Sequence, residues 1–167
     1  MITLAWIRMM AAYNAEMNRR LYAAADTLDE AQRRADRGAF FGSIHGTLSH
    51  LLWGDGFWMH RFDGWPKPPG GIGTSVEFPG GWAAMKDQRA DMDARIAAWA
   101  AQLDPGWLTG DLTWFSGSRG ADVTRPRAVL LTHFFNHQTH HRGQVHALLT
   151  SFGAATGDTD LPFILDF

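Results

Sequence analysis

Histidine is the residue type in this chain whose number and spacing could do chemistry. The 167 residues include eight histidines. Five of them lie within fourteen residues near the C-terminus: His133, His137, His140, His141 and His146. Imidazole nitrogen is a common ligand of divalent metals. Function is therefore sought first in this segment.

The spacing of His137 and His141 suits the chelation of one divalent metal. Residues three or four apart share a face of a helix. The two histidines lie on one stripe with apolar residues: Leu130, Phe134, Val145, Leu148 and Phe152. The apolar members must point into the core, and they carry the two imidazoles inward. Two buried imidazoles without a partner would be costly, which favours a metal over the simpler alternative of hydrogen bonds to neighbouring side chains.

A third ligand must come from another helix, because two ligands rarely suffice. The segment 40–62 offers three histidines: His45, His50 and His60. His50 lies near the edge of the apolar face of that segment, whereas the other two point further away. We therefore expect a neutral metal site of three histidines: His50, His137 and His141.

Other kinds of site are excluded by counting residues. The chain has three glutamates, Glu16, Glu30 and Glu77, and none begins a Glu-x-x-His pair, which excludes a carboxylate-rich di-iron site. It contains no His-Glu-x-x-His, Gly-x-Gly-x-x-Gly or P-loop motif. Three neutral ligands match a catalytic zinc site, which keeps open positions for water or substrate. Zinc and nickel are the first candidates, and iron(II) and manganese also accept imidazole.

Helices must position these histidines. Apolar periodicity predicts four long helices, at residues 3–26, 40–62, 82–103 and 126–152. A short helical turn is expected within residues 29–38. Residues 63–81 are dense in Pro and Gly and are expected to form a long, functional loop. Residues 111–124 are expected to form a β-hairpin, with residues 116–120 at its turn. Four long helices in one domain favour an all-α four-helix bundle.

The composition limits the class of protein. The chain carries 15 Lys and Arg against 17 Asp and Glu, so it lacks the basic surplus that nucleic-acid binding normally requires. Cysteine is absent, which excludes a disulfide, a cysteine zinc site and a catalytic thiol. No apolar stretch approaches the length of a membrane span, and the N-terminal residues lack the pattern of a secretory signal. We therefore expect one cytoplasmic domain, residues 1–167, that binds neither nucleic acid nor membrane.

Two segments of the chain resemble the DinB family of damage-inducible helical proteins, a superfamily also called DinB/YfiT-like. They are HFFNHQTHHRGQVHALL at 133–149 and FFGSIHGTLSHLLWGDGFWMHRF at 40–62. The resemblance runs nearly end to end, and its specific part is the string Asn-His-x-x-His-His-Arg-Gly-Gln. It implies a four-helix bundle that binds a divalent metal through three histidines, which transfer by motif to His50, His137 and His141.

The resemblance also implies a class of chemistry. Characterised relatives include thiol-dependent S-transferases and a thiol-dependent isomerase, in which the metal holds a low-molecular-weight thiol as thiolate. We therefore expect a metal-dependent enzyme of the thiol S-transferase type that acts on a small electrophile. Because the chain has no cysteine, the thiol must arrive as a cosubstrate. A metal-dependent hydrolase and a non-catalytic, damage-inducible metal-binding protein are the alternatives.

Three further features carry expectations. Asp55 lies in the apolar face of segment 40–62 and is expected to form a structural ion pair, for instance with Arg142, while a contact with a ligand histidine is the alternative. Gln144 lies on the metal side of its helix, where it could orient water or serve helix packing. The eight tryptophans are expected mostly in the core or in a homodimer interface, with a substrate pocket as the alternative. Related bundles often pair, so a homodimer is expected.

Overall fold

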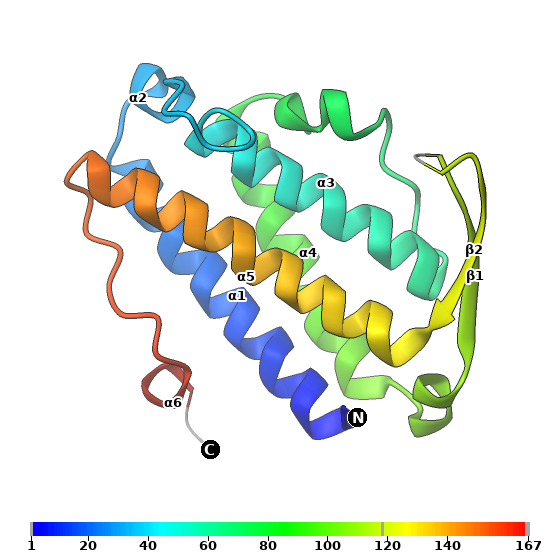
Figure 1. Ribbon diagram of the computed structural model, residues 1–167. Helices are drawn as coiled ribbons and strands as arrows, with labels where there is room; N and C mark the ends of the chain where they lie inside the picture. The colour runs from blue at the N-terminus through cyan, green and yellow to red at the C-terminus, as the bar shows by residue number, and fades with distance from the viewer. Residues whose placement is uncertain (1, 118, 166–167) are drawn as a thin grey trace.

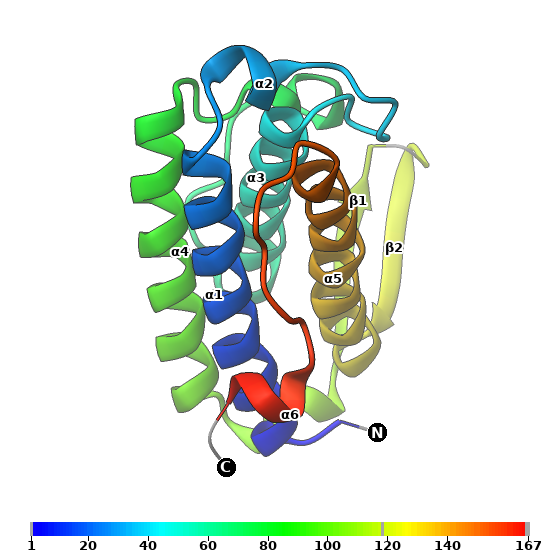
Figure 2. The same cartoon turned by 90° about the vertical axis from the view of Figure 1, so that its left-hand side faces the viewer.

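Four long helices make up most of the fold. A computed structural model describes residues 2–117 and 119–165 of the chain. The long helices are α1 (Leu4–Asp26), α3 (Ile44–Asp63), α4 (Trp82–Gln102) and α5 (Arg127–Ser151). They lie side by side, with their axes in roughly the same direction (Figure 1, Figure 2). The sequence predicted an all-α fold, and the structure is mostly helical with one two-stranded antiparallel hairpin. None of the helices in these ranges is both long and apolar enough to cross a membrane.

The second long helix begins later than the sequence predicts. Apolar spacing predicts that the helix starts at Phe40, whereas α3 begins at Ile44. Gly42 adopts a φ of 73°, which bends the chain before the helix starts. The side chain of Ser43 then accepts a hydrogen bond from the backbone amide of Gly46 at 3.0 Å and caps the helix. Local capping therefore decides the start of α3.

Shorter elements fill the connections between the long helices. They are α2 (Glu30–Arg34), the 3₁₀ helices η1 (Ile72–Glu77) and η2 (Pro105–Thr109), strands β1 (Asp111–Ser116) and β2 (Ala121–Pro126), and α6 (Leu161–Ile164). The strands pair antiparallel with Ser116 opposite Ala121, which confirms the predicted hairpin. Ser118, in the predicted turn, lies outside the described residues. The predicted loop over 63–81 contains η1, which packs against α3.

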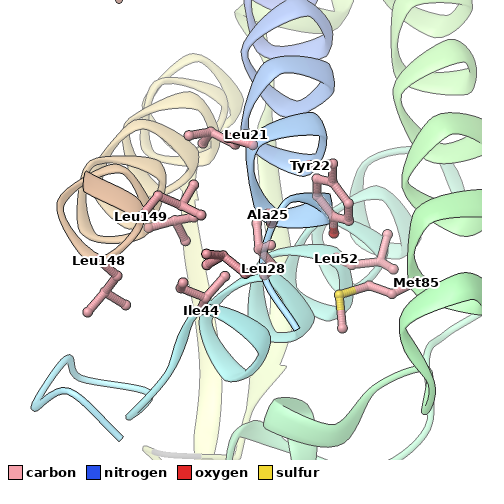
Figure 3. Packing of buried hydrophobic residues seen from close by; sticks show 12 residues of the cluster. Leu21, Tyr22, Ala25, Leu28, Ile44, Leu52, Met85, Leu148 and Leu149 are labelled. Atoms are coloured by element: carbon pink, nitrogen blue, oxygen red, sulfur yellow. The ribbon is translucent and has the colours of Figure 1, made fainter. Parts of the chain in front are cut away.

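The apolar core has two parts, one toward each end of the long helices. The part at the C-terminal end of α1 is drawn in Figure 3, with the labelled members Leu21, Tyr22, Ala25, Leu28, Ile44, Leu52, Met85, Leu148 and Leu149. The part at the N-terminal end of α1 includes Ile7, Ala11, Met59, Phe62, Ile96, Leu131 and Phe134. Each part takes residues from α1, α3, α4 and α5, so the burial of apolar surface holds the four helices together.

A buried polar cluster lies between the two apolar parts. Arg89 of α4 donates to Asp55 of α3 at 2.7 Å and to Asp93 at 2.6 Å. Gln138 of α5 donates to the other oxygen of Asp55 at 3.0 Å, and Asn18 of α1 donates to Asp93 at 3.0 Å. Buried charges are tolerated when they are paired and hydrogen-bonded. The cluster therefore connects all four long helices in the middle of the fold.

Asp55 has the structural ion-pair role expected of it, but its partner is Arg89. The expectation that Arg142 pairs with Asp55 is wrong, because the guanidinium of Arg142 donates to the side-chain oxygen of Asn14. Burial raises the pKa of Asp55, and the charge of Arg89 opposes this rise. The carboxylate does not hydrogen-bond a histidine of the described chain, so it supports the packing of the helices.

Candidate metal centre

Three histidines from α3 and α5 converge at one point. One ring nitrogen from each of His50, His137 and His141 lies within 4.8 Å of the other two. The Nε2 atoms of His50 and His137 are 3.2 Å apart. These are the histidines that helical spacing singled out, and together they could hold a metal ion.

A glycine makes room for the ring of His137 between the two helices. A Cβ atom at Gly54 of α3 would lie 3.3 Å from Cε1 of His137. Such a contact is tight, so a side chain at position 54 would crowd the imidazole of His137. The bare backbone of Gly54 thus lets α3 and α5 present their histidines to each other.

The imidazole of His50 is held by residues outside its own helix. Its Nδ1 atom lies 2.9 Å from the hydroxyl oxygen of Ser75 in η1. That hydroxyl donates to the carbonyl of Ile72 at 2.7 Å, so the Nδ1–H of His50 must be the donor to Ser75. The ring of Phe41 stacks on the imidazole with 3.8 Å between centroids. The Nε2 lone pair is therefore directed toward the centre of the group.

Gln144 orients His141 in a similar way. Its amide oxygen lies 2.8 Å from Nδ1 of His141, so Nδ1 carries the proton and Nε2 keeps its lone pair. Metal-binding histidines usually donate their other ring N–H to an acceptor of the protein. The sequence placed Gln144 on the metal side of its helix, and the structure shows that its amide contacts an imidazole there.

His137 differs from the other two histidines at its far nitrogen. Its Nδ1 atom is buried and lacks a hydrogen-bond partner within the described ranges. Its Nε2 atom faces Nε2 of His50 at 3.2 Å. Two nitrogens that bind one zinc ion at about 2.0–2.1 Å, with bond angles between octahedral and tetrahedral values, lie about 2.8–3.4 Å apart. The observed separation falls in this range, so the donor set fits a divalent metal.

Burial keeps these imidazoles neutral near pH 7. It lowers the pKa of His50 to about 4 and the pKa of His137 to about 3. The neighbouring imidazoles add to the effect, because a positive charge on one ring disfavours a second charge nearby. Burial also lowers the pKa of His141. The neutral imidazole is the form that binds metals, so the three rings are ready to act as ligands.

A cleft of about 560 Å³ opens beside His50 and His137. Its walls include four aromatic residues and two cations: Trp53, Phe57, Trp58, Trp114, Arg61 and Lys67. A volume of this size is typical of a site for a small molecule. A ligand in the cleft would therefore lie next to the nitrogens of two of the three histidines.

The other histidines do not join the group of three. His133 lines the cleft and packs edge-on against Trp58, with 5.2 Å between the ring centroids. His146 lies elsewhere on α5, where its Nε2 atom is 3.2 Å from the hydroxyl of Thr156. His133 thus belongs to the wall of the cleft, whereas His146 is part of the packing around the C-terminal segment.

Ser75 and Phe41 are the parts of the site that sequence reasoning missed. Ser75 lies in the segment predicted as a loop, and no spacing relates it to His50. Phe41 lies in a region predicted to be helical, where its ring would have had a different direction. The one signal that pointed to Ser75 is the expectation that the long loop 63–81 has a function.

The fold and the histidine group define a class of protein: a mostly helical domain with a candidate three-histidine metal centre beside a cleft. The family model described as the DinB family matches residues 1–167, the whole chain. The protein therefore belongs to the DinB family, as the resemblance of its histidine segments predicted. No curated protein and no solved structure matches the chain.

Proposed function

We propose that the protein binds one divalent metal ion through the Nε2 atoms of His50, His137 and His141, within a four-helix bundle of the DinB type. The convergence of these three histidines is the observation that carries the proposal. It is supported by Ser75 and Gln144, which engage the Nδ1 atoms of two of the rings and leave Nε2 available. Zinc and nickel are the first candidates, because both accept imidazole nitrogen.

We further propose that the site transfers a thiol sulfur to a small electrophile. A divalent ion held by three neutral imidazoles would keep its positive charge and would lower the pKa of a thiol beside it. The chain has no cysteine, so a low-molecular-weight thiol must enter as cosubstrate.

His133 acts as the acceptor of the thiol proton. Desolvation at the cleft wall lowers the pKa of His133, and the charge of Arg61 adds to this, so the ring is neutral near pH 7. The imidazole takes the thiol proton as the sulfur forms its bond to carbon and the leaving group departs with the electron pair of the broken bond.

Metal-dependent hydrolysis is the second candidate, and His133 is compatible with it. A neutral imidazole at the cleft wall can accept a proton from water as well as from a thiol. Product formed from an ester without any thiol would favour this reaction. A non-catalytic, damage-inducible metal-binding protein is the conclusion if neither reaction occurs.

The test uses untagged protein loaded with cobalt, whose visible spectrum responds to a change of ligand. Small thiols should alter this spectrum, and a panel of thiols with a model electrophile should give turnover that a chelator abolishes. His133→Ala should slow turnover and leave the cobalt content unchanged. A spectrum that responds to no thiol would contradict the S-transferase proposal.

A further inference from the structure

Arg61 places a cation in the cleft beside the histidines, without a counter-ion among the described residues. Its guanidinium carbon lies 4.5 Å from the ring centroid of Phe57, 4.6 Å from that of Trp58 and 5.3 Å from that of Trp114. No hydrogen bond or ion pair joins this side chain to another residue within 2–117 and 119–165. Burial lowers the pKa of Arg61 to about 10, so the group stays charged at neutral pH. The three rings hold the guanidinium in place and leave its N–H groups without an acceptor.

The rest of the cleft adds to this positive charge. Lys67 lies on the same wall, with its ammonium 5.3 Å from the ring centroid of Phe57. None of the described residues that line the cleft is an Asp or a Glu. Among the lining residues that the structure describes, the cleft therefore carries two cations and no carboxylate.

A half-buried cation without a partner favours an anionic ligand. Partial desolvation of a charge costs free energy, and an anion that enters the cleft offsets this cost. Arginine presents two parallel N–H donors that match the two oxygens of a carboxylate. The faces of the surrounding rings can take up the apolar body of the same molecule.

We infer that the cleft binds an organic acid, with its carboxylate at Arg61, its apolar body between the aromatic walls and its other end beside His50 and His137. Arg61 lies three turns after His50 on α3, about 16 Å along the helix axis. Its side chain leans back by one turn, because it contacts Phe57 four residues earlier. The ligand is therefore an elongated acid. The inference rests on the proposed function for the reaction at the histidines, whereas the binding of the carboxylate needs no metal.

The test compares the binding of phenylbutyrate and its uncharged analogue phenylbutanamide to the metal-free, full-length protein by isothermal titration calorimetry. The acid should bind at least tenfold more tightly than the amide. This preference should disappear in Arg61→Gln and remain in part in Arg61→Lys, which keeps the charge but not the planar donors. Arg37→Gln is the matched control, because Arg37 also stacks on a ring, 4.2 Å from the centroid of Phe152, but lies outside the cleft.

Three results would overturn the inference: equal binding of acid and amide, a preference that survives in Arg61→Gln, or no saturable binding to the unaltered protein. If circular dichroism shows that Arg61→Gln does not fold, Arg61→Lys and the acid–amide comparison decide. Since the titration is done without metal, its failure is distinct from a failure of the cobalt–thiol experiment. If the protein prefers the acid but thiols do not change its cobalt spectrum, the proposed acid site stands and the S-transferase proposal is contradicted.

Discussion

The Nε2 atoms of His50 and His137 lie 3.2 Å apart although the two histidines are 87 positions apart in the chain. Two imidazole nitrogens at this distance need either a proton or a metal ion between them. His50 carries its proton on Nδ1, where it donates to Ser75, so its Nε2 atom is an acceptor. In the metal-free protein the Nε2–H of His137 donates to Nε2 of His50. The proposed metal would replace this proton.

Removal of a ligand histidine should remove the metal. We expect His137→Ala and His141→Ala each to abolish stoichiometric binding, because two imidazoles rarely hold a divalent ion in a protein. Elemental analysis of untagged, dialysed protein measures this directly. His146→Ala is the control and should keep its metal, since His146 contacts Thr156 and not the group of three. A complete loss of metal in His133→Ala would instead mean that a different face of α5 binds it.

Removal of the acceptor behind His50 should weaken metal binding without abolishing it. Ser75→Ala leaves the Nδ1–H of His50 without its partner at 2.9 Å, so the ring is no longer held in one orientation. We expect the metal affinity to fall about 10- to 100-fold in competition with a chromophoric chelator. Ser151→Ala is the control, because that hydroxyl donates to the carbonyl of Leu148 near the end of α5. Equal affinities of the two variants would refute a role for Ser75.

The stability of the metal-free protein should fall as the pH drops from about 7 to about 5. The pKa of His50 is lowered to about 4 and that of His137 to about 3 from 6.5, chiefly by burial. The unfolded chain therefore binds more protons than the folded protein in this interval, and acid favours unfolding. The loss is at most about 2 kcal/mol for each of these histidines. Urea unfolding across the pH range measures it, and His137→Gln should reduce the slope. A stability that does not change over the interval would contradict the burial of neutral rings.

Loss of the arginine in the buried polar cluster should be far more damaging than loss of a surface lysine on the same helix. Arg89→Met leaves Asp55 and Asp93 buried without their cation, and we expect a loss of about 3–5 kcal/mol in the free energy of unfolding. Lys86→Met breaks an exposed ion pair with Asp26 and should cost about 1 kcal/mol or less. Urea denaturation of both variants makes the comparison, and similar losses would disprove the structural role of the cluster.

Association as a homodimer stays a prediction. The exposed large apolar side chains of the described residues are Phe40, Ile72, Phe115, Val129 and Phe163. A second copy that covers some of them would remove apolar surface from water. Light scattering at micromolar concentration should give about twice 18.6 kDa. A monomeric mass across a concentration series would rule the dimer out.

The sequence by itself determined the long helices and the face that carries the histidines. Apolar spacing is a local property, so His137 and His141 could be placed one turn apart on an inward stripe before any contact was known. The same reasoning on the second long helix selected His50, although it placed the start of that helix four residues too early. Family membership was also readable from the histidine string, and the match over residues 1–167 confirms it.

Tertiary structure alone decided which residues support these histidines. Ser75 behind His50 and Arg89 beside Asp55 each join two different elements, and Phe41 folds back onto the ring of His50 from the segment before α3. It also decided the place of the tryptophans: three line the cleft, and the others pack, partly buried, against the apolar core. Periodicity tells which face of a helix is buried. The rotation and spacing between helices, and the path of the loops over them, are set by the packing of the whole core and have no local signal.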